Sequence, residues 1–407
     1  MLRGLLVLLS GGIVRQLVVV ATLPVLARIY GPEAFGALGA VMAIVSMGAV
    51  VIHGRYHQAI PVARDDAEAR ALLVLSCLMT CALAIPAAAL LVLVFGTPIA
   101  GVGSLLAWVV PLTALAAVID VLTYWRSRRR RYAASARLDA ARACATVAGQ
   151  FVLVPLGAAG LLLGTVLGTA IAAALAFAHA GARAFAPVRV STLRAVALRY
   201  RQYPLLGVPQ GWTASASRNL FPLLLVKFGG IALAGQYWVG YRLLMMPVAL
   251  MATAYRQVAL PGFRDAAPDA NRGAAWQHTL ALLALGLVPA TLLFLHGEWL
   301  MTRALGAEWN GAGLLLGWLG LAALGDACKI PAITLLQRDG RQDAILTWEL
   351  SIAGLRYVAA TFLLLEGETL AAVAAFAAIG AAGWAAFVLR ALAPWSRREE
   401  RAPLSRG

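Results

Sequence analysis

The chain has 407 residues, of which 61% are apolar and 13% charged, and its mean hydropathy is +0.81. Soluble domains are about 45–50% apolar and about 25% charged, so this composition excludes an ordinary soluble fold. The net charge of +16 would suit a nucleic-acid-binding protein. In a membrane protein, however, an excess of Lys and Arg marks the cytoplasmic loops and is attracted to anionic lipid heads. We therefore expect an integral membrane protein with no nucleic-acid partner.

Twelve apolar segments follow one another along the sequence. Residues 71–119 and 143–182 contain no charged residue, and each stretch is long enough for two crossings of roughly 20 residues. Four cysteines lie in the apolar segments, at spacings that fit neither a disulfide framework nor a zinc site. The sequence thus predicts an all-α polytopic membrane protein. Its twelve helices are expected at residues 4–28, 34–54, 70–95, 103–124, 143–159, 160–180, 206–228, 232–254, 276–296, 312–336, 344–365 and 369–390.

Basic residues favour every second connection. The connections that follow an even number of segments, taken with both termini and the adjoining segment ends, hold 27 of the 34 Lys and Arg residues. Those that follow an odd number hold three, namely Arg28, Lys227 and Arg303. Basic loops resist translocation, so the pattern predicts both termini and the longer connections, such as 125–142 and 255–275, in the cytoplasm.

The two halves of the sequence resemble each other. Residues 95–134 align without gaps to residues 305–344, and residues 55–61 resemble residues 255–261 at a similar offset. The matched pairs are Trp108 with Trp318, Arg128 with Arg338, Arg131 with Arg341 and Gly36 with Gly235. Each half holds six predicted helices, so we expect two parallel six-helix repeats around a central cavity, related by an axis along the membrane normal.

This repeat defines the predicted domains. Residues 1–180 form the N-terminal six-helix lobe, and residues 206–390 form the C-terminal one. Residues 181–205 are expected to be a cytoplasmic inter-lobe linker, and residues 391–407 a basic cytoplasmic tail. A substrate site is expected between the two lobes, near the membrane midplane.

Four arginines lie inside predicted helices, near the membrane midplane. A charge in lipid costs at least a few kcal/mol unless it is used or paired. The arginines, with the polar neighbours of two of them, are Arg15 (with Gln16), Arg218 (with Asn219), Arg242 and Arg356. One interpretation is a cationic chamber, because guanidinium groups bind phosphate oxygens in bidentate fashion. The alternative is structural pairing with an acid or a helix-end carbonyl, for which Glu349 is the candidate partner of Arg356.

Three acidic residues also lie in predicted helices, namely Asp120, Asp326 and Glu349. Asp120 is expected about one turn from the cytoplasmic end of its helix. All three are candidates for coupling transport to protons or sodium ions. The favoured alternative is a local ion pair or a position at the lipid interface, because Asp326 and Lys329 have the i, i+3 spacing of a helical pair.

A stripe of small residues marks one predicted helix. Gly160, Gly164 and Gly168 recur every four residues, the spacing of a face on which another helix packs closely. The sequence contains no phosphate-binding loop, paired-carboxylate motif or metal-spaced His and Cys set. We therefore expect no catalytic residues, no metal and no cofactor.

Short motifs occur in a fixed order along the chain. A Pro-x-Leu-x-Arg element at residues 24–28 precedes a Pro-Glu-x-Phe-Gly turn at residues 32–36. An Arg-Tyr-x-x-Ala-Ile element follows at residues 55–60, and a Trp with a basic run at residues 125–132. A Gly-x-Glu-Trp-x-x-Ala-Gly element occupies residues 306–313. With these motifs the chain resembles the oligosaccharide (O-antigen type) flippases of the multidrug/oligosaccharidyl-lipid/polysaccharide exporter superfamily. His57 stands where that family usually has glutamate.

The resemblance implies a flippase that moves a polyprenyl-pyrophosphate-linked glycan from the inner to the outer leaflet by alternating access. It implies a bacterial inner-membrane protein of cell-surface polysaccharide synthesis, with a lipid-linked oligosaccharide as substrate. Membrane lipids and polysaccharide polymerase or glycosyltransferase machinery are the expected partners. Two alternatives stay open: a multidrug or cation antiporter of the same fold, and a membrane polysaccharide polymerase or ligase. The mid-depth arginines disfavour the antiporter, and the short outer loops disfavour the enzyme.

Overall fold

The structure, a computed structural model, describes residues 2–95, 103–265 and 268–392. Within these ranges the chain forms thirteen α-helices joined by short 3-10 and π turns, and no strand. Eight helical segments there are long and apolar enough to cross a membrane. The predicted all-helical polytopic membrane fold is confirmed.

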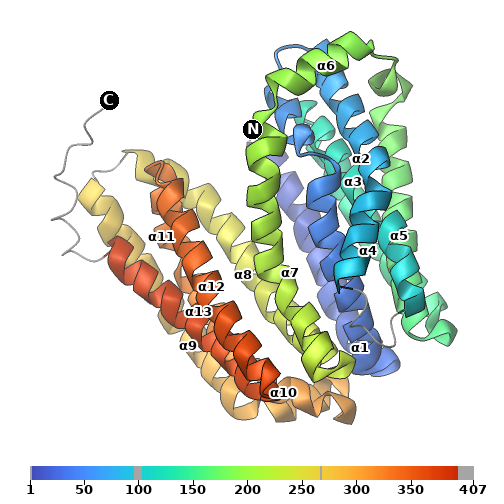
Figure 1. Ribbon diagram of the computed structural model, residues 1–407. Helices are drawn as coiled ribbons and strands as arrows, with labels where there is room; N and C mark the ends of the chain where they lie inside the picture. Colours follow the sequence, from blue (N-terminus) through green and yellow to red (C-terminus); the bar gives the residue numbers. More distant parts are fainter. Residues whose placement is uncertain (1, 96–102, 266–267, 393–407) are drawn as a thin grey trace. The chain divides into compact units, whose positions relative to one another are not determined.

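The chain forms two compact units, Met1–Gly235 and Gln236–Gly407, whose helices are labelled in Figure 1. The helices of unit 1 are α1 (Leu2–Ile52), α2 (Asp66–Phe95), α3 (Val109–Arg128), α4 (Tyr132–Val152), α5 (Ala158–Ala180), α6 (Val190–Arg199) and α7 (Val208–Gly229). Helix α8 (Ile231–Asp265) begins in unit 1 and continues into unit 2. The other helices of unit 2 are α9 (Pro268–Leu305), α10 (Asn310–Cys328), α11 (Ile330–Arg338), α12 (Gln342–Leu365) and α13 (Thr369–Leu392).

Helix α1 covers the first two predicted helices. Gly31 interrupts it with a non-helical backbone conformation (φ 71°, ψ 172°), which glycine adopts at little cost. Pro32 follows and has no N–H to continue the hydrogen-bond ladder. The predicted break between residues 28 and 34 is confirmed.

Gly36 of α1 and Gly235 of α8 lie in a reciprocal backbone contact. A Cβ on Gly36 would overlap the carbonyl oxygen of Ile231, and a Cβ on Gly235 would overlap that of Pro32. Gly235 follows Gly36, and Ile231 follows Pro32, by the same 199 positions. Such reciprocity is the mark of two equivalent segments that meet across a local twofold axis. The two glycines matched by sequence are therefore also neighbours.

The connection between α3 and α4 has the same form as the connection between α11 and α12. Arg131 has φ −84° and ψ 54°, and Arg341 has φ −84° and ψ 52°. Each is preceded by a residue with positive φ, Arg130 (53°) or Gly340 (74°). The N–H of each arginine bonds at 3.0 Å to the carbonyl five residues earlier, as in a Schellman helix cap. The repeat at an offset of 210 residues is confirmed at this corner.

The shorter predicted resemblance does not extend to local structure. Tyr56–Val62 forms a 3-10 helix after α1, whereas residues 255–261 lie inside the continuous helix α8. The two stretches are therefore similar in sequence but do not form the same secondary structure.

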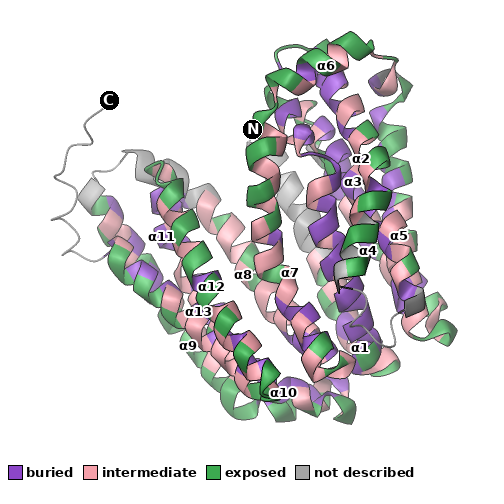
Figure 2. Ribbon diagram, viewed as in Figure 1, coloured by how far each residue is buried: buried purple, intermediate pink, exposed green. Residues whose placement is uncertain are grey.

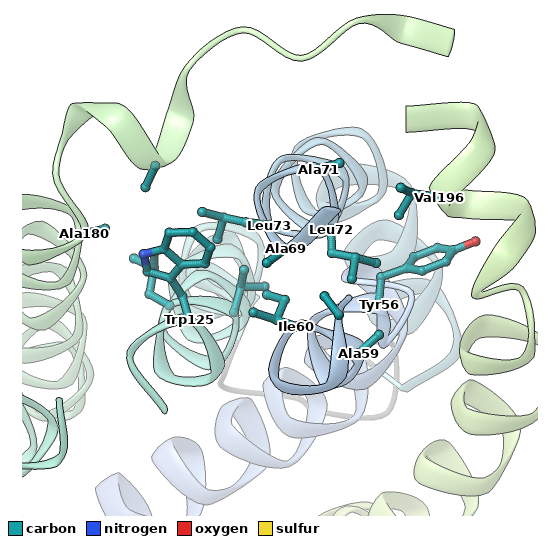
Figure 3. Packing of buried hydrophobic residues seen from close by; sticks show 14 of the residues in the cluster. Tyr56, Ala59, Ile60, Ala69, Ala71, Leu72, Leu73, Trp125, Ala180 and Val196 are labelled. Carbon is teal, nitrogen blue, oxygen red and sulfur yellow. The ribbon is translucent and has the colours of Figure 1, made fainter. Parts of the chain in front are cut away.

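The main hydrophobic core of unit 1 gathers around the 3-10 helix Tyr56–Val62. Ile60 packs in one cluster with Leu72 of α2, Trp125 of α3 and Val196 of α6 (Figure 3). Ile60, Leu72 and Trp125 are almost completely buried. One cluster therefore holds the ends of several helices together, and α6 with them.

The glycine stripe of α5 packs against α4, as predicted. A Cβ on Gly164 would lie 2.5 Å from the backbone nitrogen of Gln150, and one on Gly168 would lie 2.6 Å from that of Thr146. Only a residue without Cβ allows this backbone-to-backbone approach.

One predicted cytoplasmic connection is largely helical. Residues 125–142 were expected to be a loop, but α3 ends at Arg128 and α4 already begins at Tyr132. The predicted helix 143–159 was correspondingly wrong at both ends, since α4 ends at Val152. Hydropathy misplaced the first end because a helix continues into the headgroup region, where charged side chains are solvated. It misplaced the second because a proline-containing 3-10 turn, Val154–Leu156, follows α4 within an uncharged stretch.

Two other predicted connections also contain helix. Within residues 255–275, α8 continues to Asp265 and α9 begins at Pro268. Within residues 181–205, the short helix α6 is largely exposed (Figure 2). The predicted division into lobes at residues 180 and 206 stays a prediction, and α7 packs against α1 inside unit 1. Most of the predicted tail, residues 393–407, lies outside the described residues.

Candidate substrate-binding residues

Helix α7 presents Arg218 at its middle. The helix begins with Pro209 near its N-terminus, a favourable position for proline, and its 22 residues extend over about 33 Å. Arg218 lies ten residues after Val208 and eleven before Gly229, and it is exposed. In the part of the chain that the structure describes, its guanidinium forms no recorded hydrogen bond or ion pair. The Arg218 side chain is thus an exposed cation at the middle of α7.

The neighbouring Asn219 has structural partners. Its amide donates to the carbonyl of Ser215 at 2.8 Å and to the hydroxyl of Ser215 at 3.3 Å. The Ser215 hydroxyl in turn donates to the carbonyl of Ser46 in α1 at 3.2 Å. This network ties α7 to α1 and fixes the face of α7 that carries Arg218.

Helix α8 carries Arg242 beside aromatic rings. The guanidinium carbon lies 4.9 Å from the ring centroid of Trp238, one turn earlier, in a cation–π contact. Tyr237 and Tyr241 stack with their centroids 5.8 Å apart, and Tyr237 is buried. The i, i+4 spacing of Trp238 and Arg242 was a signal of this contact that the sequence prediction did not use.

Arg356 packs among rings inside unit 2. Its guanidinium carbon lies 4.4 Å from the ring of Phe376 in α13 and 5.9 Å from that of the adjacent Tyr357. The structure thus places Arg356 of α12 against a ring of α13. Phe376 was missed by sequence reasoning because no local pattern links it to Arg356.

The predicted pair of Asp326 and Lys329 is confirmed. The Lys329 ammonium forms an ion pair with the Asp326 carboxylate and lies 3.7 Å from the ring centroid of Trp384. Lys329 separates α10 from α11, so the pair stabilises a break between two helices. Trp384 lies on α13 and was not predicted as a partner.

The remaining predicted residues are not assembled into one site. Arg15 belongs to α1, but its side chain lies outside the described residues, and Gln16 is half-buried. Glu349 is half-buried in α12. Asp120 is exposed and interacts electrostatically with Arg142. It lies about two turns from the end of α3, instead of the predicted one, because the helix extends to Arg128. The shared cationic chamber stays a prediction.

Two buried histidines lie beside the motif at residues 55–60. The rings of His53 and His57 are 4.0 Å apart, and the two residues are 4% and 3% exposed. Burial, then the nearby His57 and Arg55, lowers the pKa of His53 to about 2. Burial and Arg55 lower the pKa of His57 to about 3. Where the resembling family has glutamate, this protein therefore places a neutral imidazole.

A buried carboxylate fastens α6 to α2. Glu68 accepts hydrogen bonds from the Arg64 backbone N–H at 2.8 Å, from the Arg199 guanidinium, and from the Tyr200 hydroxyl at 3.3 Å. Burial and the neighbouring Glu68 raise the pKa of the Tyr200 hydroxyl, so it remains a donor. Figure 1 shows α6 running across the end of α2. Sequence reasoning missed this anchor because its partners are more than 130 residues apart.

Residues 25–313 match the sequence model of the family described as "Polysaccharide biosynthesis protein", which is well over half of the chain. None of the curated proteins matches the chain. Among solved structures, an inward-facing multidrug resistance transporter of the MATE family, in the MOP superfamily, is 16% identical with a TM-score of 0.65. That match covers 95% of this chain and 99% of the other. A MOP superfamily transporter from Pyrococcus furiosus is 15% identical with a TM-score of 0.56, over 96% and 93% of the two chains. These likenesses show the fold.

Proposed function

This chain belongs to the polysaccharide biosynthesis protein family, and from that membership we propose that it is a flippase. Its substrate is a polyprenyl-pyrophosphate-linked glycan, which it moves from the inner to the outer leaflet by alternating access. The similarity of its fold to MOP superfamily transporters supports transport as the activity. The reciprocal backbone contact between residues 32–36 and 231–235 supports a fold built from repeats. Transporters that work by alternating access are commonly built in this way.

The observation that carries the proposal is Arg218. It is an exposed arginine at the middle of α7, which the sequence predicts to cross the membrane. At about 33 Å the helix has the length to cross a hydrocarbon core of about 30 Å, although it is not among the eight segments that are also apolar enough by composition. Exposure of that charge to lipid would cost at least a few kcal/mol, so the side chain must face water or an anionic ligand. A pyrophosphate offers the acceptor oxygens that a guanidinium binds in bidentate fashion.

The other predicted residues take different roles in this proposal. Arg242 has an aromatic partner, which orients its guanidinium without neutralising it. We assign it to substrate binding together with Arg15 and Arg218. Arg356, which packs on Phe376, is assigned a structural role first and a binding role second.

Two of the three acidic residues predicted for coupling transport to protons or sodium ions remain candidates. Asp326 is occupied by Lys329, and a paired carboxylate is a weaker candidate for binding a transported cation. Asp120 and Glu349 remain candidates for coupling to protons or sodium ions. The same reasoning disfavours the cation antiporter, because a cationic substrate needs an available carboxylate near the midplane, where this chain presents Arg218.

The test is a flipping assay with the full-length protein in proteoliposomes, using a labelled polyprenyl-pyrophosphate-linked sugar. Arg218→Ala should reduce the flipping rate roughly tenfold or more, since a hydrogen bond to a charged group contributes about 1.5–3 kcal/mol. Arg218→Lys should restore part of the rate, because a point charge attracts phosphate but lacks the planar fork. Arg137→Ala is the matched control, at an exposed arginine of α4 that donates to the Ala133 carbonyl of its own helix at 3.4 Å.

The outcomes separate the alternatives. Wild-type flipping by Arg218→Ala at normal abundance would remove the main support for the proposal. Loss of abundance in that variant would instead indicate a structural arginine. Transport of a lipophilic cation, with no flipping of the pyrophosphate lipid, would favour the antiporter.

Topology and partners complete the proposal. The distribution of basic residues supports cytoplasmic termini, and the family membership supports the proposed location in a bacterial inner membrane. The glycan-lipid would be supplied by glycosyltransferases on the cytoplasmic side and used by a polymerase on the other. Cysteine labelling at residue 130 from inside, and not from outside, would support this orientation.

A further inference from the structure

A pocket of about 160 Å³ lies at one end of unit 2, where four candidate membrane segments end. Three arginines from three different helix ends line it: Arg272 near the start of α9, Arg341 immediately before α12, and Arg390 in the last turn of α13. The membrane segments in question start at residues 270 and 342 and end at residues 338 and 392. The pocket therefore lies at the boundary between the hydrocarbon core and water.

The lining combines cationic and apolar side chains. Asp339 is the acidic member of the lining, and it forms an ion pair at 3.4 Å with Arg338. The lining therefore holds three arginines and one carboxylate, which already has a basic partner. Trp348 and Phe387 provide part of the apolar wall, and the Trp348 indole is fixed by a hydrogen bond of 3.0 Å to the Gly383 carbonyl.

The equivalent corner of unit 1 shows what is different here. There, Arg131 donates to the carbonyl of His179, in the last turn of α5, at 3.1 Å. In unit 2 the matching arginine is Arg341, and the last turn of α13 carries Arg390. The Arg341 guanidinium is exposed and forms no recorded hydrogen bond or ion pair among the described residues. In unit 1 the arginine of this turn bonds to a helix-end carbonyl, whereas in unit 2 the matching Arg341 lines a pocket together with Arg390.

We infer that this pocket binds the phosphate group of an anionic membrane lipid. Basic pockets between helix ends at the cytoplasmic face suit such headgroups. With about 30 Å³ for each water molecule, the volume holds roughly five waters, comparable with one phosphate group of five heavy atoms. The apolar wall adjoins the membrane segments, so an acyl chain attached to the phosphate would remain in hydrocarbon. The site does not depend on the transported substrate.

The experiment measures lipid binding to the full-length protein in a neutral detergent. The probes are phosphatidylglycerol, phosphatidylcholine and inorganic phosphate, added separately, with native mass spectrometry and the apparent melting temperature as readouts. Phosphatidylglycerol should bind and raise the melting temperature, whereas zwitterionic phosphatidylcholine and free phosphate at equal concentration should do so much less. Each arginine near an anionic surface contributes about 1 kcal/mol, so Arg341→Gln should weaken phosphatidylglycerol binding about fivefold.

Two comparisons make the result decisive. Arg137→Gln removes one exposed arginine near the start of α4 and should leave the affinity unchanged. Without lipid, Arg341→Gln should melt like the wild type, because its side chain is exposed. Equal weakening by both variants would show general charge attraction and overturn the site. Equal stabilisation by phosphatidylcholine would also overturn it. Equal stabilisation by inorganic phosphate would overturn the lipid assignment, with the pocket then taking the free anion.

Discussion

The reciprocal contact between residues 32–36 and 231–235 allows a two-sided test of the fold. A methyl group added at Gly36 would overlap the carbonyl oxygen of Ile231 and lie 2.9 Å from its carbonyl carbon. One added at Gly235 would overlap the carbonyl oxygen of Pro32 and lie 2.6 Å from the backbone nitrogen of Gly36. Optimal contacts are about 3.5–4.0 Å, so either methyl requires the segments to separate by roughly 1.5–2 Å from the overlapping carbonyl oxygen.

The expected destabilisation follows from the kind of atom that must move. Overpacking costs typically about 1–3 kcal/mol, and rigid backbone obstacles place these variants at the upper end. Replacing a helical glycine by alanine returns at most about 1 kcal/mol of helix propensity. We therefore expect Gly36→Ala and Gly235→Ala each to lower stability by about 2 kcal/mol. The double variant should cost less than twice that, because one separation admits both methyl groups.

The assay is the apparent melting temperature of the full-length protein in detergent. Gly354→Ala is the matched control, since a Cβ there meets nothing within 4 Å and the residue lies inside α12. It should melt at or slightly above the wild-type temperature. If Gly36→Ala and Gly235→Ala both melted like this control, the close approach would be wrong. If only one were destabilised, the contact would not be reciprocal.

Two further predictions concern buried groups of unit 1. The folded-state pKa values of His53 and His57, about 2 and about 3, lie below the unfolded value of 6.5, so the unfolded state binds more protons and stability falls as pH decreases below about 6.5. Each histidine contributes at most about 1.4 kcal/mol per pH unit. When the pH is lowered from 7 to 5, the melting temperature of His57→Gln should therefore fall less than that of the wild type. Equal decreases would contradict the assignment. Glu68→Ala should loosen α6 by removing the partner of Arg199, at a stability loss of roughly 2 kcal/mol, and limited proteolysis within residues 190–205 should accelerate. Asp66→Asn, at an 81% exposed carboxylate, is its control and should leave the cleavage rate unchanged.

Local patterns carried most of what the sequence predicted correctly. The break at Gly31, the glycine stripe of α5 and the ion pair of Asp326 with Lys329 all depend on residues a few positions apart. Helix geometry fixes which of these face one another, so spacing alone is sufficient. The ends of α4 and α8 were predicted less well, because hydropathy reports where the membrane ends, and a helix can continue beyond that point.

The environments of the intramembrane arginines depended on distant segments. Arg218 and Arg356 look alike in sequence, since each is an arginine near the middle of a predicted membrane helix. In the structure Arg218 is exposed, whereas Arg356 packs on Phe376 of another helix. Nothing within a few residues of either arginine predicts that difference. It arises from the packing of α12 against α13, which only the tertiary structure determines.

The turn between α3 and α4 and the matching turn between α11 and α12 share a backbone conformation but differ in their side chains. The turn needs a residue with positive φ, and Gly340 provides it without strain. Arg130 occupies the same place in unit 1 with φ 53°, although a residue with Cβ pays roughly 1–2 kcal/mol in that region. The turn itself gains nothing from the arginine. Attraction of one arginine to anionic lipid contributes about 1 kcal/mol, so a position of this corner at the lipid headgroups, which the basic loop predicts, would offset a cost of this size. The two corners thus share a backbone turn and differ in their charged side chains, with Arg130 in one and Arg390 beside the other.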